Sequence, residues 1–153
     1  MSWKYALYIP LFLFLAVVLW FAFLSATSKR PDNLGLVDGH LAPCPSSPNC
    51  VCSQNADADH QIAPIQVGDE KDPMARLASV IGGMSGAKVI TTKANYLHAE
   101  FTSFVFHFVD DVEFLFDPET KLLHCRSASR VGHSDLGVNR KRIEAIRKAF
   151  ATK

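Results

Sequence analysis

The chain has 153 residues, a length that fits one ordinary domain or a somewhat smaller domain with an appendage. Hydrophobic residues make up 48% and charged residues 20%, which excludes a chain that is disordered by composition. The formal net charge of +1 gives no support for nucleic-acid binding, because neutralising phosphates requires a basic surface. These totals hide an uneven distribution, since much of the apolar content lies in one N-terminal block.

The first feature along the chain is an uncharged apolar run from Ala6 to Ala26. It has about 21 residues, where about 20 suffice to cross the hydrocarbon core of a membrane. Lys4 precedes the run, Lys29 and Arg30 follow it, and aromatic residues gather at its start, as is typical of residues at a membrane surface. Residues 1–29 are therefore predicted to form a transmembrane anchor in the lipid bilayer.

The alternative for this run is a cleaved signal peptide, whose apolar region has roughly 7 to 15 residues and ends at a small-x-small site. Leu24 lies two positions before Ala26, and Phe23 lies two positions before Ser25, so neither position offers the small pair. We therefore expect an uncleaved anchor. The basic charges on its two sides nearly balance, so the positive-inside rule does not decide the orientation.

All four cysteines follow the anchor, at Cys44, Cys50, Cys52 and Cys125. An even number of cysteines outside a membrane span favours disulfides and hence an oxidising compartment. This predicts a single-pass protein of the inner membrane with its domain on the periplasmic side. The alternative is four free thiols on the cytoplasmic side.

A polar, proline- and glycine-marked tether is predicted over residues 30–40, followed by a soluble domain over residues 41–153. From Leu41 to Ile65 the chain carries four prolines, so a regular helix or a central strand is not expected there. A disulfide between Cys44 and Cys50 would order this loop, and so short a ring contributes about 2 kcal/mol by chain entropy.

Two helices are expected in the domain. Asp72 can cap the first helix, Pro73 suits its first position, and Gly82 ends it. The second helix is expected from Asp135 to Phe150, with one apolar face.

Between these helices the apolar periodicity changes to two, which predicts β-strands. The expected strands are Ala87–Lys93, Asn95–Thr102, Phe104–Val109, Val112–Asp117 and Lys121–Ser127. Their short connections favour antiparallel neighbours. The third and fourth strands are expected to give the core one aromatic face, from Phe104, Phe106, Phe108, Phe114 and Phe116. The prediction is an α+β domain of two layers, in which an antiparallel meander of four to five strands carries two helices on one side.

The soluble part is acidic up to Cys125 and basic from Arg126 onwards. One hypothesis is a pocket in which arginines hold an anion by bidentate hydrogen bonds, helped by free amides at the start of the last helix. Its candidate residues are Asp110, Asp111, Arg126, Ser127, Ser129, Arg130, Asp135, Asn139 and Arg140. The alternative, which we favour, is a structural network of arginines and carboxylates in which the serines and the asparagine satisfy local backbone groups.

Three strings are more specific than these patterns: PCPSSPNCV at residues 43–51, FVDDVEF at 108–114 and RSASRVGHSDLGVNR at 126–140. On these strings the chain resembles the domain of unknown function 1499 family, over about Leu41 to Phe150. The resemblance implies a small membrane-anchored or exported protein with no established reaction. The family usually has serine where this chain has Cys52, and Cys125 stands at a variable position. These two departures favour a second disulfide that would link the loop to the fifth strand.

Enzyme signatures are weak. Zinc bound by Cys44, Cys50, Cys52 and a histidine lacks the usual C-x2-4-C pair, and a cysteine–histidine nucleophile pair needs a proximity that spacing does not show. No metal or cofactor is expected. Two function classes remain open: a membrane-tethered binding or scaffolding module for a protein or an anionic small molecule, and a small enzyme that uses the arginine–aspartate cluster around residues 110–140. A deep pocket lined by convergent arginine and aspartate favours the enzyme.

Overall fold

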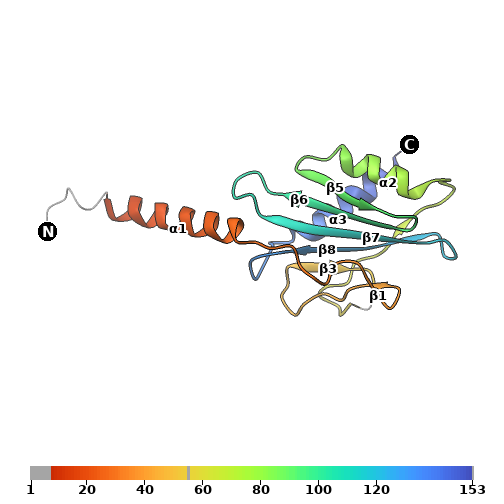
Figure 1. The fold of residues 1–153 in the computed structure, drawn as a ribbon, viewed down its shortest axis with the longest axis horizontal. Coiled ribbons are helices and arrows are strands. Elements are labelled where there is room, and N and C mark those ends of the chain that lie inside the picture. The colour runs from red at the N-terminus through yellow and green to blue at the C-terminus, as the bar shows by residue number, and fades with distance from the viewer. Residues whose placement is uncertain (1–7, 55, 153) are drawn as a thin grey trace.

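The fold is known from a computed structural model, which describes residues 8–54 and 56–152 (Figure 1). The helices are α1 (Tyr8–Ala26), α2 (Pro73–Gly82) and α3 (Val138–Ala151). The strands are β1 (Leu36–Val37), β2 (His40–Leu41), β3 (Cys50–Cys52), β4 (Ile65–Gln66), β5 (Ala87–Thr92), β6 (Tyr96–Thr102), β7 (Val109–Asp117) and β8 (Leu122–Ser129).

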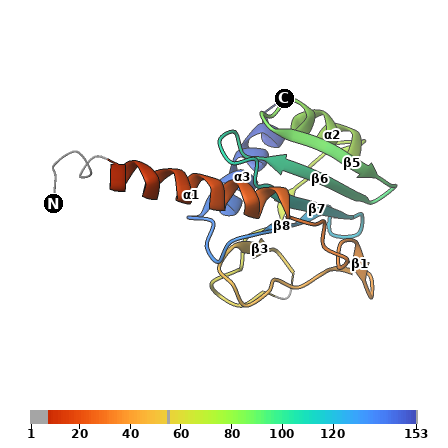
Figure 2. The ribbon, with the colours of Figure 1, turned by 60° about the vertical axis from the view of Figure 1, so that its left-hand side comes forward.

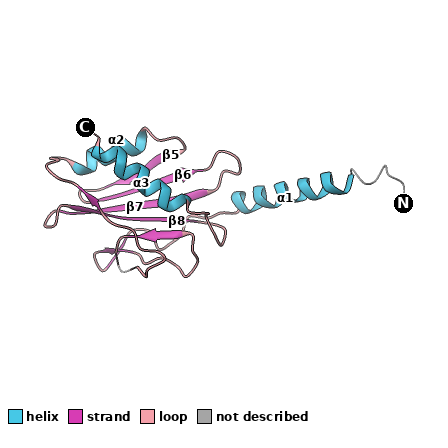
Figure 3. Cartoon of the chain, turned by 180° about the vertical axis from the view of Figure 1, so that it is seen from behind, coloured by secondary structure: helices cyan, strands magenta, loops and turns pink. Residues whose placement is uncertain are grey.

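Six strands form one antiparallel sheet in the order β3-β8-β7-β6-β5, and β4 also pairs with β8. Consecutive strands β5 to β8 are neighbours, so the expected meander is present with four strands. Helices α2 and α3 lie together over one face of the sheet (Figure 3). The short hairpin of β1 and β2 packs near β7 and β8 from the other side. The α+β prediction is confirmed.

The core lies between the sheet and the two helices. Side chains alternate along β6, β7 and β8, so that every second residue faces the helices, and most of these residues are apolar. The fully buried members of this core include Leu77, Ile81, Leu97, Val112, Phe114, Leu123, Ile143 and Ile146. Each such side chain contributes roughly 1.5–3 kcal/mol by leaving water, which fixes the position of the sheet against α2 and α3.

The first predicted helix agrees with α2 in both bounds. Asp72 accepts a hydrogen bond from the Ala75 amide, and Pro73 occupies the first helical position. The second prediction begins three residues too early, because Leu136 and Gly137 adopt left-handed φ angles of 54° and 77°. The helix therefore begins only at Val138.

The strand expected over Phe104–Val109 is wrong. Residues 103–108 are the loop between β6 and β7, closed by a hydrogen bond from the Ser103 amide to the Phe108 carbonyl, and Val109 is the first residue of β7. Phe104 is 96% exposed, whereas the rings of Phe106 and Phe108 pack against α1 instead of entering the core. Of the expected aromatic face, Phe114 alone is fully buried and Phe116 packs against the core edge.

In the proline-rich segment, β3 and β4 pair in succession with β8, and the prolines stand outside both strands. The expected Cys44–Cys50 disulfide is present, with a Cα–Cα distance of 5.7 Å. The second predicted disulfide is not formed, because Cys52 and Cys125 are both free thiols in the described chain. Cys52 pairs in register with Arg126, so neighbouring Cys125 points to the opposite face of the sheet.

Helix α1 projects from the domain, with all its side chains exposed or half-buried (Figures 1 and 2). By length and composition it can cross a membrane, and a signal sequence would pass the same test. Lys4 and two of the aromatic residues at the start of the apolar run, Trp3 and Tyr5, lie outside the described residues. After α1 the predicted tether contacts the sheet, since the Gly35 amide donates to the Glu113 carboxylate at 2.7 Å.

Candidate functional site

The candidate residues divide between two faces of the sheet. Alternation along β7 and β8 places Asp111 and Arg126 on the face away from the helices, with Arg130 just beyond the end of β8. The same alternation turns Asp110, Ser127 and Ser129 toward the helices. Neighbouring Asp110 and Asp111 therefore belong to two separate clusters.

Asp111 lies at the centre of the first cluster, on the sheet face away from the helices, and 1% of its area is exposed. Its carboxylate accepts hydrogen bonds from Arg130 Nε at 2.7 Å and Nη2 at 2.8 Å, and His98 Nε2 lies 2.8 Å from Oδ1. Burial acts to raise the pKa of Asp111, but the hydrogen bonds from Arg130 and His98 outweigh it and lower the pKa. Asp111 is therefore an ionised acceptor.

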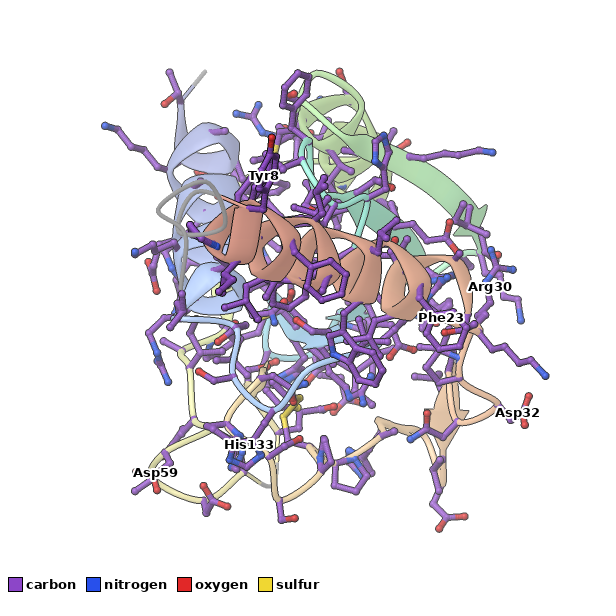
Figure 4. The ribbon with its side chains drawn as sticks, turned by 90° about the vertical axis from the view of Figure 1, so that its left-hand side faces the viewer. Tyr8, Phe23, Arg30, Asp32, Asp59 and His133 are labelled. Carbon is purple, nitrogen blue, oxygen red and sulfur yellow. A yellow bond between two sulfur atoms is a disulfide. The ribbon has the colours of Figure 1, made fainter. Side chains whose placement is uncertain are left out.

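Glu113 and Glu100 extend this cluster. The fully buried Glu113 carboxylate accepts from Arg126 Nη1 at 2.9 Å and from the Tyr96 hydroxyl at 2.7 Å. Glu100 accepts from Arg130 and from Arg30, which follows the end of α1 (Figure 4). The guanidinium groups of three arginines thus pair with three carboxylates: Arg30, Arg126 and Arg130 with Glu100, Asp111 and Glu113. The tether covers this face of the sheet.

Atoms of His98, Glu100 and Asp111 lie within 4.8 Å of one another, a spacing that could hold a metal ion. Arg130 hydrogen-bonds to both of these carboxylates, so a guanidinium already supplies the positive charge at this point. These contacts form a network of arginines and carboxylates. Such a network is the alternative that the sequence analysis set against an anion-binding pocket.

A cavity of about 360 Å³ opens beside this network. Its lining comes from the tether, the disulfide loop and strands β7 and β8, and includes Asp111, Arg126 and Arg130 together with Pro31, Asn33, Cys44 and Ala128. Arg126 is 3% exposed, and its Nε has no hydrogen-bond partner among residues 8–54 and 56–152. A buried donor without an acceptor costs about 1–3 kcal/mol, so an acceptor at this nitrogen is expected to bind favourably.

The second cluster joins α3 to the sheet on the helix face. Buried Asn139 accepts from Ser127 Oγ at 2.5 Å and donates from Nδ2 to the Asn49 carbonyl at 2.9 Å. Arg142 donates to Asn139 Oδ1 at 2.6 Å and to Asp110 Oδ2 at 2.5 Å. These groups satisfy one another, so the cluster holds α3, β8 and the disulfide loop together.

The remaining two candidates stand apart from the cavity. Arg140 donates to the backbone carbonyls of Gln61 at 2.8 Å and Asp59 at 3.0 Å. Asp135 accepts from the amides of Gly137 at 2.9 Å and Asn139 at 2.8 Å, so it occupies backbone amides at the start of α3, whose N-cap residue is Gly137. The free amides proposed for anion binding are therefore partly occupied by the chain's own carboxylate.

Sequence reasoning missed Tyr96, His98, Glu100 and Arg142 as members of the clusters. The signal was available in β6, where polar residues at 96, 98 and 100 alternate with apolar ones at 97, 99 and 101. That alternation places His98 on a strand face, but it does not reveal the tether that covers and buries this face.

The free cysteines Cys52 and Cys125 are buried, and hydrogen bonds hold the ring of His60 in place. Burial raises the pKa of Cys125 to about 12 and also raises that of Cys52, so neither thiol is ready to act as a nucleophile. The His60 ring lies between the Ser47 carbonyl, 3.1 Å from Nε2, and Asp57 Oδ1, 2.7 Å from Nδ1. His60 therefore fastens the disulfide loop to the following turn.

A family model described as "Protein of unknown function (DUF1499)" matches residues 40–150. The chain belongs to the DUF1499 family. The matched part begins in β2 and ends in α3, so it contains the whole six-stranded sheet and α2, whereas α1 and the Arg30 member of the first polar cluster precede it. No curated protein and no solved structure matches the chain.

Proposed function

We propose that this DUF1499 protein is a single-pass membrane protein whose domain lies on the periplasmic side of an inner membrane and serves as a binding module. The 19 residues of α1 span about 28 Å, close to the roughly 30 Å thickness of a hydrocarbon core. The Cys44–Cys50 disulfide supports an oxidising compartment. No small-x-small pattern ends at Ser25 or Ala26, the last residues of α1, and the one that ends at Ser28 lies beyond the helix. This supports retention of the helix as an anchor.

The proposed binding site is the cavity beside Arg126 and Arg130. The observation that carries this proposal is that Arg126, whose buried Nε has no partner among the described residues, lines an open volume of about 360 Å³. The carboxylates nearby already accept two or more hydrogen bonds each. The missing component is therefore an acceptor, and a small carboxylate ligand is the simplest group that supplies it.

The enzyme alternative has less support, although Asp111 lines the cavity together with Arg126 and Arg130. General acid–base catalysis favours a group whose pKa lies near the working pH, whereas the hydrogen bonds from arginine lower the pKa of Asp111 and Glu100 against the effect of burial. Both carboxylates also have guanidinium partners. Carboxylates paired in this way orient the arginine side chains and neutralise their charge, which suits a binding site.

Binding is tested with the purified full chain in detergent, using acetate, succinate, citrate and inorganic phosphate as probes in calorimetric titrations. Ala128→Leu adds side-chain volume to the cavity lining, and Ala151→Leu at the exposed end of α3 is the matched control. We expect heat of binding for at least one probe in the wild type and in Ala151→Leu, and its loss in Ala128→Leu. Binding that survives in Ala128→Leu, or no binding by any probe, contradicts the proposed site.

The orientation is tested separately by fusing a reporter that works only after export to the C-terminus. Activity of that reporter supports the periplasmic side. Activity of a cytoplasm-only reporter at the same position contradicts it.

A further inference from the structure

The loop between β6 and β7 exposes apolar side chains at its tip. Phe104 is 96% exposed and Val105 is 71% exposed. Neither residue belongs to the core clusters, so the domain gains nothing from their apolar character in water. An aromatic and a β-branched residue side by side at a loop tip point to a non-aqueous contact.

This loop packs against the C-terminal end of α1. The ring of Phe21 lies 5.0 Å from that of Phe106 and 5.9 Å from that of Phe108, measured between ring centroids. Ser25 Oγ donates to the carbonyl of His107 at 2.8 Å. Figures 1 and 2 show the β6–β7 loop beside the last turns of the helix from two directions.

The contact fixes the depth of the loop relative to the anchor. Phe21 precedes Ala26, the last residue of α1, by a rise of about 7 Å along the helix axis. If α1 spans the membrane with Ala26 near its surface, Phe106 lies at the level of Phe21. Interfacial apolar groups are buried about 5–10 Å into the boundary between headgroups and acyl chains, which is this level.

A second loop approaches the same turns of α1. Phe21 and Leu24 line a cavity of about 210 Å³ together with Val131 and Val138 from either end of the β8–α3 loop. Leu136 within that loop is 86% exposed. Two loops from separate parts of the sheet therefore present apolar side chains around the point where the helix meets the domain.

We infer that this end of the domain rests on the bilayer, with Phe104 and Val105 inserted in the lipid interface of the leaflet where α1 emerges. The inference rests on the proposed membrane anchor. Its consequence is a fixed orientation, because helix and loop contact the bilayer at two points. Lys29 follows Ala26 on the aqueous side of this level, where basic side chains are attracted to anionic headgroups.

The test uses the full chain in vesicles of phosphatidylcholine and phosphatidylglycerol, with or without bromine on the acyl chains. Trp3→Phe and Trp20→Phe first remove both native tryptophans. Phe104→Trp then reports on the loop, and Glu119→Trp is the matched control in the β7–β8 turn, at the end far from α1 (Figure 1). A chain that keeps native Trp20 reports on the helix.

Emission from Phe104→Trp is expected to shift to the blue and to lose intensity in brominated vesicles, while Glu119→Trp does neither. Quenching of Trp20 without any response at position 104 overturns the inference and leaves the anchor standing. No quenching of Trp20 overturns the anchor, and the inference with it. Thermal unfolding of Phe104→Ser in detergent is expected to match the wild type, whereas a lower midpoint would indicate a packing role instead.

Discussion

Arg130 and Asp111 show how the sheet tolerates charge on a buried face. The Arg130 side chain is 8% exposed and that of Asp111 is 1% exposed, so both ions have lost most of their water. Two hydrogen bonds between them and a further bond from Arg130 to Glu100 replace that hydration. Removal of one partner would leave a buried charge uncompensated, which is far more costly than the loss of an exposed ion pair.

Arg130→Ala is therefore expected to lower the free energy of unfolding by about 3 to 5 kcal/mol. Arg140→Ala is the matched control, because Arg140 is exposed and contacts backbone carbonyls, and its effect is expected to stay within about 1 kcal/mol. Denaturant titration of both variants in detergent measures the difference. A stable Arg130→Ala protein that has lost carboxylate binding would favour a binding role over a structural one.

His60 makes the stability of the disulfide loop depend on pH. The acceptor carbonyl of Ser47, followed by Asp57, raises the pKa of His60 above its ordinary value of 6.5, and 6% of the residue is exposed. The folded state therefore favours the protonated ring. This contribution is fully present below about pH 6.5 and is lost as the pH rises through the higher pKa of the folded state.

The free energy of unfolding is expected to fall as the pH rises from about 6.5 to 8, and His60→Gln is expected to reduce that slope. His133→Gln, at an exposed position, serves as the control. Denaturant titrations across this pH range provide the measurement. An identical slope in wild type and His60→Gln would show that another group carries the pH dependence.

At the scale of elements, the disulfide loop supplies β3 and part of the cavity wall, so its covalent state matters. Mass spectrometry of the unfolded, unreduced chain after alkylation is expected to find labels on Cys52 and Cys125. Cys44 and Cys50 are expected to be labelled only after reduction. Unreduced peptides that join Cys52 to Cys125 would contradict this arrangement and restore the second bridge.

The elements that sequence predicts well are those with local causes. Helix α2 has an aspartate cap, a proline at its first position and glycines at its end, and none of these depends on distant parts of the chain. The strand over 104–109 failed because alternating phenylalanines indicate an apolar partner without identifying it. The partner is α1, about eighty residues earlier, and no local rule supplies that contact.

The sequence predicts some partners in the candidate site and not their arrangement. Of the arginines and aspartates singled out from the sequence, Arg130 pairs with Asp111, whereas Arg140 contacts backbone carbonyls. Adjacent residues on a strand face opposite sides, however, so one pocket could not hold both Asp110 and Asp111. The burial of the sheet face away from the helices depends on the tether, which folds back over the sheet and contacts Glu113 through the amide of Gly35.

At the scale of the whole molecule, α1 and the domain are joined by more than the connecting chain. Ser25 contacts the β6–β7 loop, and Arg30 pairs with Glu100 on the sheet. Arg30 is half exposed, so this single pair contributes at most about 1 kcal/mol. The apolar contacts of Phe21 therefore matter more to the orientation of the helix, and they exist only while the helix stays attached.

Leu24→Ala tests that attachment, because it places a small side chain two positions before Ala26 and so creates a small-x-small pattern that ends within α1, in addition to the one that ends at Ser28. The wild type is expected to remain at full length in the membrane fraction and to resist alkaline extraction. In Leu24→Ala, part of the protein is expected to be cleaved after Ala26 and released into the soluble periplasmic fraction. Leu19→Ala, also within α1, removes similar apolar area without creating the pattern and should remain anchored. A shortened, soluble wild type, seen by intact mass and fractionation, would show that the run is a signal peptide and would end the anchor proposal.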